Sequence, residues 1–223
     1  HIADVSHYVV SQKAIDREAY KRGTSVYLVD RVIPMLPEVL SNGICSLNAG
    51  EDRYAMTCMM EIDTHGKVVN YRIQPSIIHV NRRCSYKEIY KALTEDIIPD
   101  DLAPLMPMIH NLSDIAKTLN DMRRRRGALD FDFPEYKVLL DTEGTPLRIV
   151  RRDRTLAERL IEECMLIANE TVATHLKNTN RTSVYRIHET PSEEKMSMYQ
   201  KVLNYLGQDI RLHLDELEPR VFQ

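Results

Sequence analysis

The chain has 223 residues, of which 43% are hydrophobic, and this is enough to form the core of one sizeable domain. No run of about 18 consecutive apolar residues is present, so the sequence contains no candidate membrane span. The net charge of −3 and the pI near 6.3 argue against a protein that coats nucleic acid with a broad basic face, so any contact with nucleic acid must be local.

The cysteines indicate a reducing compartment. Cys45, Cys58, Cys84 and Cys164 form no CxxC pair and lie in apolar or mixed surroundings. Such spacing is typical of reduced thiols in a cytosolic protein. The sequence therefore predicts a cytoplasmic protein without disulfide bonds and without a structural zinc site.

The first third of the chain predicts a helix followed by extended segments. Residues 1–10 form an apolar-rich run that does not begin with Met, and the chain closes abruptly at 221–223, so we expect both ends to be cuts within a longer protein. Residues 14–22 have helical composition and end at Gly23, a natural C-cap. An extended stretch over 24–33 follows.

Two later segments predict β-hairpins. In residues 54–62 apolar and polar side chains alternate, as in a half-buried strand, and a turn at 63–66 leads into a partner strand over 67–73. A second hairpin uses a similar turn and pairs 136–140 with 146–151.

Helices are predicted between and after the hairpins. A short one is expected over 85–94. A longer one carries a single apolar stripe, with Pro107 in its first turn and Gly127 at its end. The residues of that stripe are Leu105, Ile109, Leu112, Ala116 and Leu119.

The last third of the chain predicts two more helices and a strand. A helix over 155–177 has one broad apolar face, 183–187 is strand-like, and a last helix begins near Pro191. Hairpins and helices without strict βαβ alternation indicate an α+β domain, in which a mixed sheet with two β-hairpins packs against several helices.

The sequence contains no familiar catalytic motif but resembles a known family along nearly its whole length. No nucleophile elbow, P-loop, HExxH or metal-spaced Cys/His cluster is present. Several long segments, in the same order, nevertheless resemble the ribonuclease R/ribonuclease II (RNB) family of exoribonucleases. They are residues 1–9 (HIADVSHYV), 22–28 (RGTSVYL), 32–37 (VIPMLP), 40–47 (LSNGICSL), 124–131 (RRRGALDF) and 162–169 (EECMLIAN).

The resemblance implies that residues 1–223 are a partial RNB catalytic domain, truncated at both ends. The activity it implies is processive, Mg²⁺-dependent hydrolysis of single-stranded RNA from the 3′ end to 5′-mononucleotides. The family's metal-binding aspartates precede the segment that matches 1–9, so the Mg²⁺ ligands are expected upstream of residue 1, and Asp4 is not one of them. The family's Arg-rich catalytic segment and terminal β-barrel would follow Gln223. We therefore expect no catalytic or metal-binding residue in this chain, and no activity from it alone.

Four residues match family positions that hold RNA. The resemblance assigns Tyr27 and Phe131 to a pair of rings that sandwich the terminal bases, and neighbouring Phe133 is an alternative for the second ring. It assigns Tyr86 and Glu162 to sensing the ribose 2′-hydroxyl, by which a protein distinguishes RNA from DNA. The alternatives are that the rings belong to the core or its rim, and that Glu162 is a solvated helix carboxylate.

Three further patterns bear on the site. On a helical wheel Glu162 lies at the edge of the apolar arc, whereas Glu163 points elsewhere. The run 123–126 is all arginine, which suits either the RNA backbone or the negative end of a helix dipole. The histidines show no ligand spacing. They are His1, His7, His65, His79, His110, His175, His188 and His213.

The sequence is also compatible with two functions other than an exoribonuclease. One is a non-catalytic module, or a degenerate RNB protein, that grips single-stranded RNA without cutting it. The other is an α+β interaction domain that does not bind nucleic acid, which the acidic net charge favours. Closely spaced aspartates in roughly the thirty residues upstream of His1 would favour the enzyme, because Mg²⁺-dependent hydrolysis needs clustered carboxylates.

Overall fold

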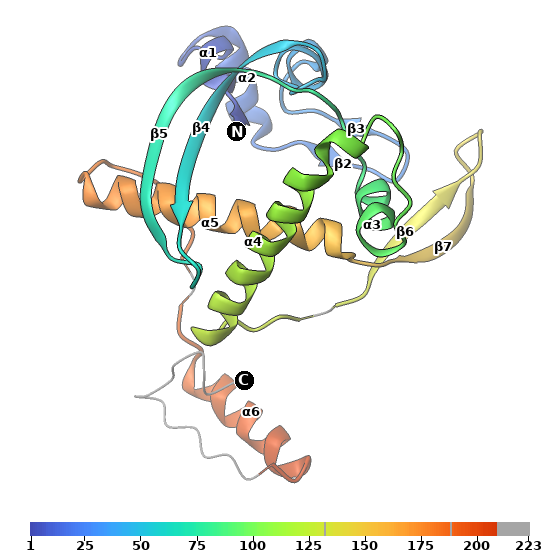
Figure 1. The fold of residues 1–223 in the computed structure, drawn as a ribbon. Helices are drawn as coiled ribbons and strands as arrows, with labels where there is room; N and C mark the ends of the chain where they lie inside the picture. The colour runs from blue at the N-terminus through green and yellow to red at the C-terminus, as the bar shows by residue number, and fades with distance from the viewer. Residues whose placement is uncertain (132, 188, 209–223) are drawn as a thin grey trace.

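The largest sheet is a long hairpin with a short third strand at its edge. Strand β4 (Asp52–Ile62) pairs antiparallel with β5 (Val68–His79), and β1 (Ile2–Ala3) pairs with the other edge of β4. In the computed structural model, which describes residues 1–131, 133–187 and 189–208, this hairpin arches over two crossing helices (Figure 1).

The turn of the β4–β5 hairpin packs tightly against a helix. Gly66 in this turn has φ of 87°, a left-handed conformation that favours glycine. A Cβ atom on Gly66 would lie 3.0 Å from Cβ of Met122 and 3.2 Å from the carbonyl oxygen of Thr118, both on α4 (Met106–Arg125). The hairpin therefore reaches α4 only because this position has no side chain.

The core lies where α3 (Tyr86–Thr94), α4 and α5 (Leu156–Asn178) meet. The sequence starts α3 with Ser85 and α5 with Thr155, and each of these residues forms a capping box with a glutamate three positions later. Ala92, Leu102, Met106 and Ile109 form one buried cluster, next to the short 3₁₀ turn Ala103–Leu105.

The remaining elements are smaller. Helices α1 (Val5–Tyr8) and α2 (Ala14–Arg22) precede a short hairpin of β2 (Val26–Tyr27) and β3 (Val32–Ile33). A π-helical turn covers Val39–Ile44.

A second hairpin and a further helix complete the part of the chain that the structure describes. The β6–β7 hairpin (Glu135–Leu140 and Pro146–Arg152) projects away from the body and joins it at the start of α5, and α6 (Glu193–Tyr205) lies at the far end of the molecule (Figure 1).

The α+β class and the predicted helices and hairpins are confirmed. The two long hairpins belong to separate antiparallel sheets, where we expected one mixed sheet. The strand expected over 183–187 is wrong, because these residues form no regular secondary structure and the Val184 side chain is 99% exposed. A strand needs a neighbour to satisfy its backbone, and β-branched composition alone does not supply one.

The structure also bears on the cysteines and on membrane-spanning segments. Cys45, Cys58, Cys84 and Cys164 are all free. In the part of the chain that the structure describes, no helix is both long and apolar enough to cross a membrane.

Candidate nucleic-acid interface

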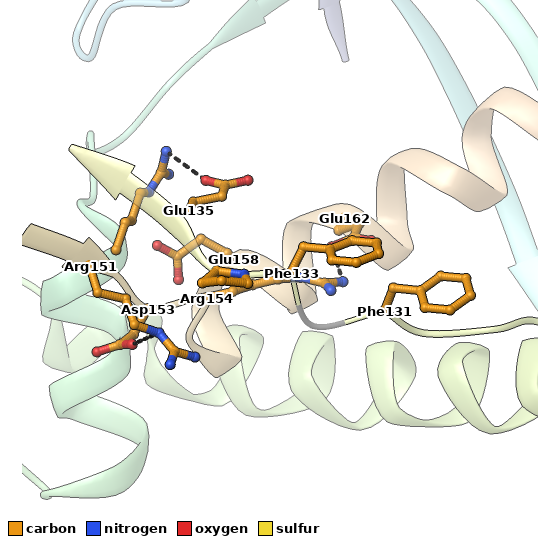
Figure 2. Close-up of a pocket in the computed structure, with 10 residues that line it drawn as sticks. Phe131, Phe133, Glu135, Arg151, Asp153, Arg154, Glu158 and Glu162 are labelled. Atoms are coloured by element: carbon orange, nitrogen blue, oxygen red, sulfur yellow. Dashed lines mark hydrogen bonds and ion pairs between the residues drawn. The ribbon is translucent and has the colours of Figure 1, made fainter. Parts of the chain in front are cut away.

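A cavity of about 500 Å³ lies where the base of the β6–β7 hairpin meets the first turns of α5 (Figure 2). It is formed by the connection that leads from α4 into β6, the start of β6, the end of β7, the link between β7 and α5, and α5 itself. The residues that line it are Phe131, Phe133, Pro134, Glu135, Arg151, Arg152, Asp153, Arg154, Glu158 and Glu162.

Two parallel phenylalanine rings stand at one side of this cavity. The centroids of Phe131 and Phe133 are 5.5 Å apart, and their planes are inclined by only 18°. Both residues are mostly exposed, at 64% and 76%. Exposed flat rings are chemically suited to stacking on a nucleobase, and such stacking tolerates any base because every base has a π-face.

Glu162 faces the same cavity from α5 and is held there by Arg154. Nη2 of Arg154 donates to Oε2 of Glu162, and its Nη1 donates to Oδ1 of Asp130 at 3.0 Å. Burial of Arg154 works to lower the pKa of its guanidinium, but the hydrogen bonds to Asp130 and Glu162 outweigh it and the pKa is raised. The guanidinium therefore stays charged between two carboxylates.

The charges around the cavity are mixed. Three arginines and four carboxylates line it, and the arginines are paired with acids. Nε of Arg151 lies 3.4 Å from Asp153, and Nη1 of Arg152 lies 3.7 Å from Glu135. The cavity therefore has no net positive charge for a phosphate, and its chemistry is better suited to a base and a sugar hydroxyl.

The structure brings together two of the four expected RNA-binding residues. Phe131 and Glu162 line the cavity, and Phe133, the alternative ring, lies there too. Tyr27 lies in β2, opposite Val32, and is 78% exposed, whereas Tyr86 is the first residue of α3 and is partly exposed. Among the described residues that line this cavity, neither tyrosine is present.

Glu163 is the polar residue that the helical wheel misplaced. Glu163 is buried on α5, with only 3% of its surface exposed, whereas the side chain of its neighbour Glu162 is about two-fifths exposed. Its position three residues after Leu160 and four before Ile167, both buried, is the signal that the wheel should have used.

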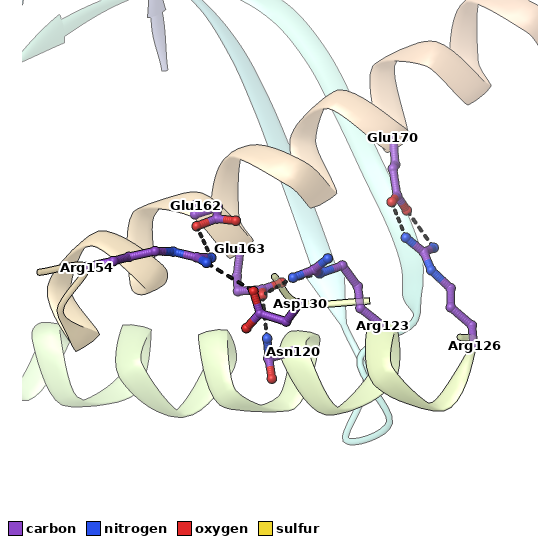
Figure 3. A network of polar contacts seen from close by, with 8 residues as sticks. All are labelled: Asn120, Arg123, Arg126, Asp130, Arg154, Glu162, Glu163 and Glu170. Atoms are coloured by element: carbon purple, nitrogen blue, oxygen red, sulfur yellow. Dashed lines mark hydrogen bonds and ion pairs between the residues drawn. The ribbon is translucent and has the colours of Figure 1, made fainter. Parts of the chain in front are cut away.

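A bidentate contact satisfies the buried Glu163 carboxylate. It accepts hydrogen bonds from Nδ2 of Asn120 at 2.7 Å and from Nε and Nη2 of Arg123 at 2.9 and 2.7 Å (Figure 3). Burial works to raise the pKa of Glu163, but the hydrogen bonds from Arg123 and Asn120 outweigh it and the pKa is lowered.

The arginine run joins α4 to its neighbours. Arg123 binds Glu163 and Arg126 binds Glu170 (Figure 3). Nη2 of Arg125 donates to the carbonyl oxygen of His65 at 3.1 Å. The run lies in the last turn of α4, where cations complement the helix dipole. Contacts within the protein therefore explain the positions of Arg123, Arg125 and Arg126, and binding to RNA is not needed to explain them.

The described residues offer no place for a metal ion. Within residues 1–131, 133–187 and 189–208, no group of three or more His, Cys, Asp or Glu side chains is arranged to hold one. The residues that the structure describes therefore do not fit the Mg²⁺ that the family resemblance implies.

Comparison with known proteins identifies the family of the chain. The RNB domain family model matches residues 1–220. The chain is 42% identical to ribonuclease R 1 of Lactococcus lactis over 224 residues, covering 100% of this chain and 27% of the relative. It is 47% identical to ribonuclease R of Thermotoga maritima over 208 residues, covering 93% of this chain and 29% of the relative. The chain thus spans less than a third of these two relatives.

Solved structures give the same result. Mycoplasma genitalium RNase R in complex with ribose-methylated single-stranded RNA matches with a TM-score of 0.93 and 31% identity, over 99% of this chain and 34% of that one. Yeast Ssd1, described as a pseudonuclease, matches with a TM-score of 0.70 and 18% identity, over 95% of this chain and 25% of that one, which shows the fold alone. From the family model, the identities and the fold, this chain belongs to the RNB domain family.

Proposed function

We propose that this chain is the RNA-holding part of a processive 3′→5′ exoribonuclease that acts in the cytoplasm. Its substrate is single-stranded RNA and its products are 5′-mononucleotides. The observation that carries the proposal is the match, over 99% of the chain, to an RNase R structure in complex with single-stranded RNA.

The cavity chemistry supports a role in holding the substrate. Phe131, Phe133 or both stack on a base, which needs no particular sequence. Glu162 accepts a hydrogen bond from a ribose 2′-hydroxyl, a group that DNA lacks. Tyr27 and Tyr86 add a second stacking ring and a second sugar contact from outside the cavity.

We propose that the complete protein requires Mg²⁺. Aspartates expected upstream of residue 1 would hold the ion, which would supply an activated water and stabilise the leaving oxygen. The residues of this chain hold the base and the ribose.

A second candidate is a protein that binds single-stranded RNA without cutting it. The observation in its favour is the yeast Ssd1 match, because that protein has this fold and is described as a pseudonuclease. Fold alone therefore does not establish hydrolysis, and the two candidates must be separated by experiment.

The test uses the complete protein and single-stranded RNA labelled at its 5′ end. Stepwise shortening from the 3′ end, with 5′-mononucleotides released only when Mg²⁺ is present, is the expected result. Tight binding of the RNA with no shortening at any Mg²⁺ concentration would favour the binding protein. Absence of both binding and shortening would exclude both candidates.

A further inference from the structure

Arg154 connects the two halves of the candidate site. Its Nη1 donates to Oδ1 of Asp130 at 3.0 Å, and Asp130 immediately precedes Phe131 in the chain. Its Nη2 donates to Oε2 of Glu162 on α5. One guanidinium therefore holds both the segment that carries the aromatic rings and the carboxylate that faces the cavity (Figure 3).

Arg154 is itself well anchored. Its side chain is 29% exposed, less than that of either carboxylate partner. The next residue, Thr155, is the N-cap of α5, where its side chain accepts a hydrogen bond from the backbone of Ala157. The position of the guanidinium is thus tied to the start of the same helix that carries Glu162, two turns further on.

The contact leaves part of Glu162 available. Arg154 engages Oε2, and among the described residues Oε1 of Glu162 has no hydrogen-bond partner. A carboxylate fixed through one oxygen presents the other in a defined direction, which is what a sugar-sensing acceptor needs.

We propose that Arg154 is a positioning residue for ribose recognition, and this inference rests on the function proposed above. It orients Glu162 so that Oε1 accepts the hydrogen bond of a ribose 2′-hydroxyl. Through Asp130 it also fixes the backbone next to Phe131, so that the base and the sugar of the bound RNA are held by one connected unit.

The planar fork of arginine is essential to this role. Its two Nη atoms reach two carboxylates at once, whereas the ammonium of a lysine is a single point charge on a flexible stem. Arg154→Lys keeps the charge but cannot keep both contacts in place. A role that depended on charge alone would survive that substitution.

The test compares variants of the complete protein on two substrates. One is a single-stranded RNA, and the other is the same strand with one 2′-deoxy residue near its 3′ end. The ratio of their degradation rates measures sugar discrimination. Arg154→Lys and Arg154→Met are each made alone and together with Glu162→Ala, and Glu170→Gln is the matched control. Glu170, like Glu162, lies on α5, and Glu170→Gln weakens its exposed pair with Arg126 at the end of α4.

We expect Arg154→Lys and Arg154→Met to lower the discrimination ratio by roughly threefold to tenfold, the size of the effect of losing an ordinary hydrogen bond. In the Glu162→Ala background neither substitution should lower it further, because Arg154 acts through Glu162. Glu170→Gln should keep the wild-type ratio. The melting temperature of each variant is measured on the same preparation.

Two outcomes would overturn the inference. One is wild-type discrimination in Arg154→Lys and Arg154→Met. The other is an equal loss with and without Glu162, which would mean that Arg154 acts independently or only stabilises the fold. If the wild-type protein degrades no RNA, the proposed function itself fails, and this result is distinct from an active wild type whose Arg154 variants keep the ratio.

Discussion

Glu163 of α5 and Arg123 of α4 form a two-point ion pair in the interior, at 2.9 and 2.7 Å, with Asn120 as a third partner. Removing the carboxylate leaves a largely buried guanidinium without its counter-charge, and breaking one partner of such a pair costs about 3–5 kcal/mol. We therefore expect Glu163→Ala to destabilise the contact between α4 and α5 by about this amount.

Hydrogen exchange on peptides from α4 and α5, within the complete protein, measures this loss locally. Glu170→Ala is the matched control, because it removes an exposed pair with Arg126 on the same two helices. Exposed pairs contribute about 0–1 kcal/mol, so α4 and α5 should keep near wild-type protection in the control. Equal protection in both variants would show that the buried pair adds nothing specific.

The lowered pKa of Glu163 predicts that the protein becomes less stable in acid. The pKa of Glu163 in the folded state lies below its ordinary value of 4.5, because the hydrogen bonds from Arg123 and Asn120 outweigh burial. As the pH falls, Glu163 is therefore protonated at a higher pH in the unfolded chain than in the folded protein. The stabilisation by Glu163 is complete above about pH 4.5 and is lost as the pH falls from there through the folded-state pKa.

Thermal unfolding of wild type and Glu163→Gln across this range tests the prediction. The difference between their melting temperatures should be largest near neutral pH and should shrink as the pH falls below about 4.5. Other carboxylates with lowered pKa values, such as Glu88 and Asp101, are present in both proteins. Their contribution therefore cancels when the melting temperature of Glu163→Gln is subtracted from that of the wild type. A difference that stays constant with pH would contradict the assignment.

Local signals in the sequence predicted most of the fold. Alternation and turn residues gave the β4–β5 and β6–β7 hairpins, and Ser85 and Thr155 mark the starts of their helices. The strand expected over 183–187 failed because pairing depends on a neighbour that the local sequence does not name.

The candidate site could be predicted only in part. Phe131 and Glu162 were named by family resemblance, and they meet in one cavity because the end of β7 brings the chain back to α5. Arg154 carried no signal of its own, because the fold brings Asp130, 24 residues earlier in the chain, to the same guanidinium as Glu162. Glu163 was misplaced because charged residues are rarely buried unless they are paired, and its partner Arg123 lies forty residues away.

We predict that residues 1–223 alone do not degrade RNA. The described residues hold no group of side chains arranged for a metal ion, and the proposed hydrolysis needs one. The measurement is release of 5′-mononucleotides by the chain purified from a host that lacks its own exoribonucleases. Sustained release that depends on Mg²⁺ would show that the catalytic site is complete within these residues.

Tyr27 is predicted to hold a base rather than to pack in the core. Its side chain is 78% exposed, so Tyr27→Ala should leave the melting temperature of the complete protein unchanged while weakening the hold on the 3′-terminal bases by about 1–3 kcal/mol. The end-product length should change accordingly. Tyr20→Ala, at an exposed position on α2, is the control and should leave it unchanged. A lowered melting temperature with wild-type end products would assign Tyr27 to packing.

The last prediction concerns Glu162 and Tyr86, which should together govern the choice of RNA over DNA. A site built to bind a 2′-hydroxyl leaves its polar groups unpaired when that hydroxyl is absent, so a single 2′-deoxy residue near the 3′ end should stall the wild-type enzyme. In Glu162→Ala with Tyr86→Ala the normal and deoxy strands should be degraded at more similar rates. The control pairs Glu170→Ala with Tyr20→Ala, which removes the same residue types from exposed positions elsewhere. Full wild-type discrimination in the Glu162 and Tyr86 double variant would make Glu162 a surface carboxylate and Tyr86 a packing ring.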